Sequence, residues 1–297
     1  MGKYTQVKYG LLNCCHPIFE ILSSNDAPIW WENVKKDKSL YIEIRKENYL
    51  NVYYKGGCIA KISYNQRKKH FEIVTHPKYL ERSVEFNPEC YKRRKKDGET
   101  VYEAIYQDCT EWLESPNKLE HLKNNVERIY SRIDEGENAS EKSIQGKLIT
   151  QNREKYLDSE FAYQFYDGKR NTIRIDLIKI ENDKFIFEEL KRIKDTRLRT
   201  TKGEPEILTQ MKKYEGFLRQ NKDALTTYYR ILYKIKKQLK LPLPKVRDID
   251  SIVVDPKPTL LIFNNYEKMG PDRADRINDI DRILKEKDIR FTITSES

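Results

Sequence analysis

The chain has 297 residues, of which 38% are hydrophobic and 35% are charged, and its formal net charge is +10. No stretch approaches the roughly 18 consecutive apolar residues of a membrane-spanning helix, and the N-terminus lacks the apolar core of a secretion signal. The composition excludes an integral membrane protein, and we expect a cytoplasmic protein with a densely charged surface.

The charge is unevenly distributed along the chain. Residues 1–100 contain 19 basic and 12 acidic side chains (+7), residues 101–150 contain 6 and 10 (−4), and residues 201–250 contain 12 and 6 (+6). Basic blocks suit a polyanion, because neutralised phosphates release their counterions. We expect nucleic acid, with DNA ahead of RNA, as the partner. A coding sequence rich in A and T, which also favours Lys, Asn, Ile and Tyr, is the alternative explanation. A protein partner or a homodimer is left open.

Five cysteines are scattered through the first part of the chain without any C-x-x-C spacing. This pattern indicates reduced thiols in a cytosol rather than a disulfide framework. A zinc site built from Cys14, Cys15 and His16 is the alternative.

Residues 1–98 are predicted to form a β-rich N-terminal domain. Between residues 39 and 76, four runs of Tyr, Ile and Val alternate with polar residues and are separated by short turns, which is typical of antiparallel strands. The pair Gly56-Gly57 predicts a hairpin turn. Trp30, Trp31 and the pair Tyr53-Tyr54 are expected in an aromatic core, with base stacking as the alternative. The basic run from Tyr91 to Gly98 is interpreted as a loop or linker, and Lys92, Arg93 and Arg94 in it as phosphate-contacting residues.

Residues 99–136 are predicted to form a helical connector and residues 137–297 an α/β domain. Apolar residues of the connector recur at helical spacing, with a break at Pro116, and Ser140 is a candidate N-cap for the next helix. The order that follows is strand (161–166), strand (172–180), strand (184–191), helix (204–220), helix (223–239), strand (259–263), helix (271–287) and strand (289–294). A helix, three strands, helices and a strand predict an α/β fold with a mixed sheet.

The most informative segment is a predicted β-hairpin over residues 174–191. If Asn182 and Asp183 form a two-residue turn, Asp176 lies directly opposite Glu189. Arg174, Lys191 and four apolar residues would share their face, and Ile175, Leu177, Ile186 and Leu190 the opposite face. The neighbouring Glu188 would point away from Asp176.

Two carboxylates that face each other repel, so a cation is expected between them. Arg174 and Lys191 could form diagonal salt bridges in an ion-paired scaffold. A divalent metal ion could instead be bound by both carboxylates. The third alternative is a different strand register.

At this point the sequence resembles the PD-(D/E)xK nuclease superfamily, in its RecB-like branch, over about residues 140–265. The resemblance rests on Asp176 followed after twelve residues by Glu189-Leu190-Lys191, on the helix that starts at Ser140-Glu141, and on Gln210-x-x-x-Tyr214. The resemblance implies a restriction-endonuclease-like core: a helix, three antiparallel strands, a helix and a further strand. The proline of the superfamily's name is absent before Asp176.

The resemblance also implies roles for these residues. Asp176, Glu189, the backbone carbonyl of Leu190 and Glu141 would hold Mg²⁺ or Mn²⁺, with Glu160 as the competitor of Glu141. Lys191 would orient the attacking water and offset the charge of the phosphate. Gln210 would fix the metal site or contact the substrate, as would Tyr214.

The expected function is therefore a metal-dependent nuclease that hydrolyses phosphodiester bonds, in restriction, repair or phage defence. The alternative is a module with a nuclease-like fold that binds nucleic acid or a partner without cutting.

Overall fold

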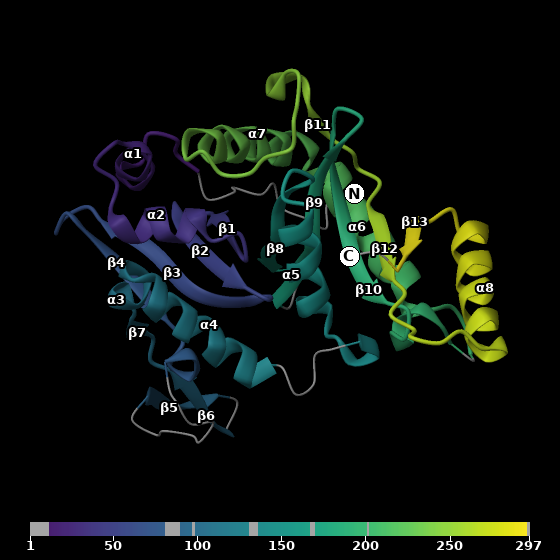
Figure 1. The fold of residues 1–297 in the computed structure, drawn as a ribbon. Coiled ribbons are helices and arrows are strands. Elements are labelled where there is room, and N and C mark those ends of the chain that lie inside the picture. Colours follow the sequence, from purple (N-terminus) through teal and green to yellow (C-terminus); the bar gives the residue numbers. More distant parts are fainter. Residues whose placement is uncertain are drawn as a thin grey trace.

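A five-stranded antiparallel sheet forms the N-terminal part of the protein (Figure 1). The computed structural model describes residues 12–80, 90–96, 99–130, 136–166, 170–200 and 202–295. The sheet has the order β1 (Leu40–Arg45), β2 (Tyr49–Tyr54), β3 (Gly57–Asn65), β4 (His70–Thr75) and β7 (Gln107–Asp108). The first four strands confirm the predicted β-rich segment.

Four helices accompany this sheet: α1 (Pro17–Ser23), α2 (Ile29–Lys36), α3 (Thr110–Glu114) and α4 (Pro116–Tyr130). Trp30 and Trp31 are buried in one cluster with Ile44 and Leu50 of the strands, as the core interpretation predicts. The predicted break at Pro116 is confirmed, because α4 begins there after α3 ends at Glu114. Short 3-10 turns lie at η1 (Pro77–Tyr79), η3 (Gly136–Asn138), η4 (Thr196–Leu198) and η5 (Ile249–Ser251).

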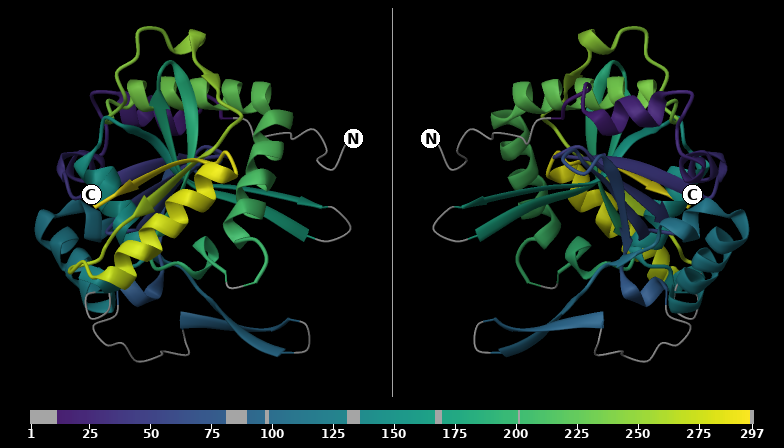
Figure 2. Two further views of the ribbon diagram at one scale, coloured as in Figure 1. Left: turned by 90° about the vertical axis from the view of Figure 1, so that its right-hand side faces the viewer. Right: turned by 90° about the vertical axis from the view of Figure 1, so that its left-hand side faces the viewer.

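Residues 91–104 correct the sequence-based prediction. The basic run is not a loop but strand β5 (Tyr91–Lys96), and residues 99–104 are not helical but form its partner β6 (Glu99–Ala104). The apolar residues Val101 and Ile105 are four apart, a spacing that fits one face of a helix and also one face of a strand. Pairing with the preceding strand decides between the two, and the resulting two-stranded hairpin extends away from the rest of the protein (Figure 2).

The second half of the chain forms a six-stranded mixed sheet. Strands β8 (Tyr156–Tyr166), β9 (Arg170–Glu181) and β10 (Lys184–Arg192) are antiparallel, and β12 (Thr259–Phe263) and β13 (Arg290–Thr294) continue the sheet in parallel with β10. The short β11 (Val253–Val254) also pairs with β10. The α/β class and the mixed sheet are thus confirmed, and the first predicted strand starts five residues earlier than expected, at Tyr156 rather than residue 161.

Helices cover both faces of this sheet. On one face, Ile144 and Leu148 of α5 (Glu141–Gln151) pack with Leu177 and Leu190 of the strands. On the other face lie α6 (Glu206–Gln220) and α7 (Lys222–Gln238), and α8 (Pro271–Glu286) lies beside β13 (Figure 1). Among the described residues, none of these helices is long and apolar enough to span a bilayer.

The turn between β2 and β3 packs directly against the backbone of α5. Gly56 has φ +78°, and a Cβ there would lie 2.4 Å from the carbonyl oxygen of Lys142. A Cβ on Gly146 would lie 2.7 Å from the amide nitrogen of Gly56. Glycine is required at both positions, because the two backbones meet without room for a side chain. The predicted turn therefore also anchors the helix that carries Glu141.

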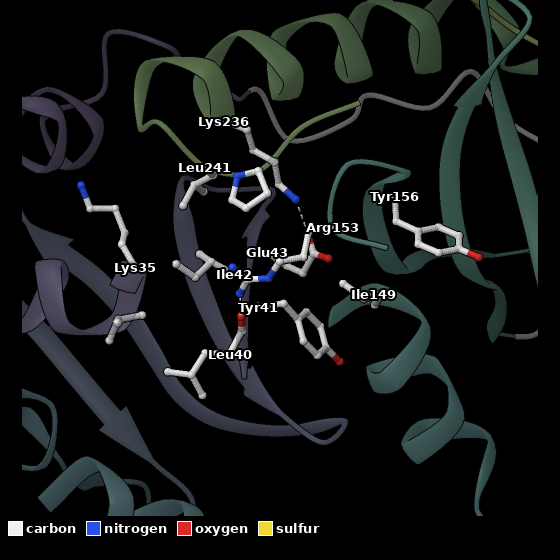
Figure 3. A pocket seen from close by; sticks show the side chains of 12 residues that line it. Lys35, Leu40, Tyr41, Ile42, Glu43, Ile149, Arg153, Tyr156, Lys236 and Leu241 are labelled. Atoms are coloured by element: carbon white, nitrogen blue, oxygen red, sulfur yellow. Dashed lines mark hydrogen bonds and ion pairs between the residues drawn. The ribbon is translucent and has the colours of Figure 1, made fainter. Parts of the chain in front are cut away.

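A group of buried charges, here named the junction, joins the two halves of the chain: Glu43, Arg45, Asp158 and Lys236. Lys236 Nζ on α7 lies 2.7 Å from Glu43 Oε2 on β1 (Figure 3), and Arg45 Nη1 lies 3.0 Å from Asp158 Oδ1 on β8. Ser159 donates a hydrogen bond to the second oxygen of Glu43, and Tyr229 donates one to the second oxygen of Asp158. Each carboxylate oxygen of the junction thus has a partner.

Candidate active site

The β9–β10 hairpin has the predicted register. Asn182 (φ 50°) and Asp183 (φ 54°) form the two-residue turn, in the left-handed conformation that hairpin turns of this length require. Glu181 pairs with Lys184, and the pairing continues to Leu177 opposite Glu188. The next residues along the two strands are Asp176 and Glu189.

Regular backbone pairing between β9 and β10 ends at Leu177. At the next residue, Asp176, the side chain rather than the backbone contacts β10. Asp176 Oδ2 accepts a hydrogen bond of 2.9 Å from the amide of Leu190, and Gln145 of α5 donates one of 2.5 Å to the carbonyl of Asp176. The regular alternation of side chains between the two faces of the sheet is interrupted at Asp176. Ile175 therefore packs in the same cluster as Phe187, whereas Leu177 packs on the opposite face. The predicted placement of Ile175 and Leu177 on one face is therefore wrong.

Lys191 lies at the centre of the site. Its Nζ lies 2.5 Å from Glu189 Oε1, 2.7 Å from the carbonyl oxygen of Leu190 and 3.6 Å from Glu141 Oε2. These three residues are the ones that the resemblance assigns to a metal ion, in addition to Asp176. Lys191, and not Arg174, is the cation that contacts Glu189 and Glu141, whereas Arg174 is exposed and pairs with Ala162 of β8.

Burial and mutual repulsion favour the protonated forms of the carboxylates. Burial and the negative charge of Asp176 raise the pKa of Glu189 to about 8. Burial also raises the pKa of Asp176 and that of Glu141. Burial opposes the charged form of Lys191, but the carboxylates of Glu189, Asp176 and Glu141 outweigh it and raise the pKa of the lysine. Lys191 is therefore an ammonium ion at neutral pH and a source of positive charge rather than a base.

Helix α6 supplies polar side chains that hold the carboxylate of Glu189 in place. The apolar residues of α6 recur at helical spacing and face the sheet, which directs Gln210 and Tyr214, one turn apart, toward β10. Gln210 Nε2 donates a hydrogen bond of 2.6 Å to Glu189 Oε1 and lies 2.7 Å from the hydroxyl of Tyr214. Because Tyr214 is only 5% exposed, its contact with the site runs through Gln210.

Helix α5 brings Glu141 to the site from the opposite face of the sheet. Ser140 caps the helix as predicted, since its side chain accepts a hydrogen bond from the amide of Ser143. Glu141 follows in the first turn, and Gln145 lies one turn later on the same side. Sequence reasoning assigned no role to Gln145, although its i+4 spacing from Glu141 places the two side chains on one face of the helix.

A second cation, Arg197 in η4, was also missed. Arg197 Nη2 lies 3.8 Å from Glu141 Oε1, and its guanidinium makes two hydrogen bonds, of 2.9 and 2.6 Å, with Asp195. The hydrogen bonds from Arg197 outweigh burial and hold the pKa of Asp195 at about 2. No periodic pattern marks Arg197 in the sequence, because the 3-10 turn that carries it is only three residues long.

Other predicted residues lie outside the cluster. Glu188 is buried on the opposite face and forms an ion pair of 3.0 Å with Lys179. Glu160 of β8 has φ +52° and accepts a hydrogen bond from Tyr53, whereas Glu141 contacts Lys191. Lys92 and Arg93 are exposed on β5; the side chain of Arg94 lies outside the described residues.

The oxygen atoms of the site fit a hard divalent cation. Glu189 Oε2 and Glu141 Oε1 are buried and have no hydrogen-bond partner among the described residues. Carboxylate and carbonyl oxygens are the ligands that Mg²⁺ and Mn²⁺ prefer. In the described part of the chain, no three His, Cys, Asp or Glu side chains form a metal-binding group by themselves. The donor set would therefore consist of Asp176, Glu189 and the carbonyl of Leu190, with Glu141 nearby.

Comparison with family models, with curated proteins and with solved structures found no match to this chain.

Proposed function

We propose that the protein is a metal-dependent nuclease of the PD-(D/E)xK type, which hydrolyses phosphodiester bonds and takes DNA as its substrate. The observation that carries the proposal is the cluster of Asp176, Glu189 and Lys191 at the point where β9 and β10 stop pairing. The order of α5, the strands β8 to β10, the helices α6 and α7 and strand β12 supports a restriction-endonuclease-like core.

The divalent ion, when bound, polarises the phosphate and lowers the pKa of a water molecule. Asp176, Glu189 and the Leu190 carbonyl would hold the ion, and Gln210 keeps the Glu189 carboxylate in place. Lys191 orients the water and offsets the negative charge that accumulates on the phosphate. Hydrolysis consumes one water, breaks one P–O bond and leaves a phosphate monoester and a hydroxyl group.

The charge balance of the site supports an enzyme over a scaffold. Four carboxylates (Asp176, Glu189, Glu141 and Asp195) lie in the site with two cations, Lys191 and Arg197, and burial favours the protonated form of the first three by raising the pKa of each. An ion-paired scaffold would be more stable with fewer acids, because unpaired buried charge is costly.

The test is incubation of the purified protein with plasmid and oligonucleotide substrates, in Mg²⁺ or Mn²⁺ and in excess chelator. We expect cleavage only with the divalent ion. Equal cleavage in chelator would contradict the proposed chemistry. Binding of the substrates without cleavage under all conditions would instead support the alternative of a non-cleaving nucleic-acid-binding module.

A further inference from the structure

Two hollows meet at β8. The first, named the Asp176 hollow, has a volume of 390 Å³ and lies beside Asp176, between α5 and the strands β8 and β9. The second, named the tyrosine hollow, has a volume of 210 Å³ and lies between the β1–β2 hairpin, β8 and α7. Glu160, Phe161 and Ala162 line both hollows. The two hollows therefore adjoin at β8, and together they are named the groove, which borders Asp176 at one end and the N-terminal sheet at the other.

The two ends of the groove differ in chemistry. Around the Asp176 hollow, the exposed cations Lys142 and Arg174 suit the phosphates of a nucleic-acid strand. Tyrosine rings dominate the other end, where Tyr49, Tyr163 and Tyr228 line the tyrosine hollow. Aromatic side chains offer stacking surfaces to bases, and stacking tolerates any base because every base has a π face.

Asn51 adds a hydrogen-bonding group to the tyrosine hollow. Its Nδ2 donates to the hydroxyl of Tyr53, while its Oδ1 is buried and has no hydrogen-bond partner among the described residues. A buried carbonyl without a donor is costly. The edge of a base carries N–H groups that would satisfy it.

The groove is held in shape by the contacts between the two halves of the chain. Tyr53 donates a hydrogen bond of 3.0 Å to Glu160, and Arg45 donates one of 2.7 Å to the carbonyl of Ser159. The volume of 210 Å³ is below the range of about 300–1,000 Å³ that is typical of sites for drug-sized ligands. The tyrosine hollow is therefore a fixed and small site.

We propose that the tyrosine hollow binds one unpaired base of the strand whose phosphodiester lies at Asp176. The inference rests on the proposed nuclease function and specifies its substrate class as nucleic acid with a single-stranded nucleotide near the cut. A base in an intact duplex is paired and stacked, so it has to leave the helix to enter the hollow. The N-terminal sheet thereby completes the substrate site.

The test measures binding separately from cleavage. Asp176→Asn protein without metal is titrated with labelled single-stranded DNA, with single-stranded RNA of the same sequence and with blunt duplex DNA. We expect at least one of the two single strands to bind about ten-fold more tightly than the duplex, because the stacking of one base on an aromatic ring raises affinity by about that factor. Comparison of the DNA and RNA strands shows which of them supplies the base.

Two variants in the same background then localise the base. Tyr49→Ala removes a stacking ring and Asn51→Ala removes the unpartnered carbonyl, and each is expected to reduce the preference for the single strand about ten-fold. Tyr106→Ala is the matched control, because it removes an exposed tyrosine that lines neither hollow. This variant should retain the preference for the single strand. Thermal unfolding establishes that each variant is folded.

The outcomes separate the two proposals. Equal binding of single strands and duplex by the Asp176→Asn protein, or an unchanged preference in folded Tyr49→Ala and Asn51→Ala, would overturn the base site. Metal-dependent cleavage by the wild-type protein would leave the nuclease proposal standing in that case. If the wild-type protein cuts no substrate but the tyrosine-dependent preference persists, the nuclease function fails and the base site remains.

Discussion

The protein buries charged side chains in two regions, and the two regions differ in how these charges are paired. In the junction, two carboxylates face two cations, and every carboxylate oxygen accepts a hydrogen bond or an ion pair. In the candidate active site, the four carboxylates of Asp176, Glu189, Glu141 and Asp195 outnumber the two cations Lys191 and Arg197, and Glu189 and Glu141 each have one buried oxygen without a hydrogen-bond partner among the described residues.

The difference matches a structural role for the junction and the proposed catalytic role for the other site. A buried carboxylate with complete pairing holds its surroundings in one geometry, and removal of one partner leaves an uncompensated charge. Carboxylates that outnumber their cations are kept at a cost to stability, which is expected where a site has to bind an additional cation. The same types of residue therefore carry opposite expectations for mutation in the two regions.

The largest expected effect is on cleavage. Asp176→Asn and Lys191→Ala should each abolish metal-dependent cleavage, because the first removes a proposed metal ligand and the second removes the only cation in contact with Glu189 among the described residues. Gln210→Ala should reduce the rate about 10- to 100-fold, since it only fixes Glu189. Initial rates on one oligonucleotide measure the effects, and circular dichroism checks the fold. Full activity in folded Asp176→Asn or Lys191→Ala protein would remove the basis for the enzyme.

Metal binding should distinguish Glu189 from its neighbour. Calorimetric titration with Mn²⁺ is expected to show binding to the wild-type protein, loss of binding in Glu189→Ala, and retention in Glu188→Gln. The physical reason is that Glu188 lies on the opposite face, where it is paired with Lys179. Glutamine is chosen at position 188 because alanine would leave Lys179 buried without its partner. The reverse result would mean that Glu188 and not Glu189 faces Asp176.

The free energy of unfolding should respond in opposite directions in the two regions. Glu43→Ala leaves Lys236 buried and unpaired, and should destabilise the protein by about 3–5 kcal/mol in urea unfolding. Asp250→Ala in η5 is the control, because it breaks the exposed pair with Lys234, which lies on the same helix as Lys236, and it should cost at most about 1 kcal/mol. Equal effects of the two variants would show that the junction is not a stabilising network.

Glu189→Gln should instead increase the stability of the metal-free protein at alkaline pH. The pKa of Glu189 is raised from 4.5 to about 8 on folding. The folded protein therefore holds a proton that the unfolded chain releases, and stability falls as the pH rises from 4.5 to about 8. The glutamine variant removes this dependence, so its stability should fall less over that range. A steeper fall in the variant would contradict the assignment.

The smallest effect is expected from the basic hairpin, which lies outside both buried regions. Neutralisation of Lys92 through Lys96 should weaken nucleic-acid binding and reduce its dependence on salt concentration. The slope of the logarithm of the binding constant against the logarithm of the salt concentration should become less steep by about 0.7–0.9 for each phosphate contact that is lost. Neutralisation of Arg282 and Lys285 on α8, which are already paired with acidic residues, serves as the control. An unchanged slope in the hairpin variant would show that β5 and β6 do not contact phosphate.

Local sequence signals were sufficient for the hairpin that carries the site. The polar pair Asn182-Asp183 between two apolar runs determines a two-residue turn, and the turn determines the register to Leu177 opposite Glu188. Helix α6 also follows from local spacing, whereas Gln210 and Tyr214 on it were picked out by the resemblance. These features depend on residues that are close in sequence, so the local sequence pattern is enough to predict them.

Features that depend on contacts between distant segments could not be predicted from local sequence patterns. The helical prediction for residues 99–104 failed because a spacing of four residues suits both helix and strand, and only the pairing with β5 decides. The change of face at Asp176 arises where the side chain replaces a backbone contact. Arg197 reaches Glu141 from the 3-10 turn η4, which is too short to show a periodic pattern in the sequence.

The sequence by itself determined the α/β class, the register of the central hairpin and the grouping of Asp176, Glu189 and Lys191, because turn chemistry and strand alternation act over a few residues. Only the tertiary structure decided that Lys191 rather than Arg174 meets the carboxylates, that α5 packs on the Gly56 turn, and that the N-terminal sheet extends the groove at Asp176. These contacts join segments as far apart as Tyr53 and Glu160, and their geometry follows from the packing of whole sheets and helices rather than from any local pattern.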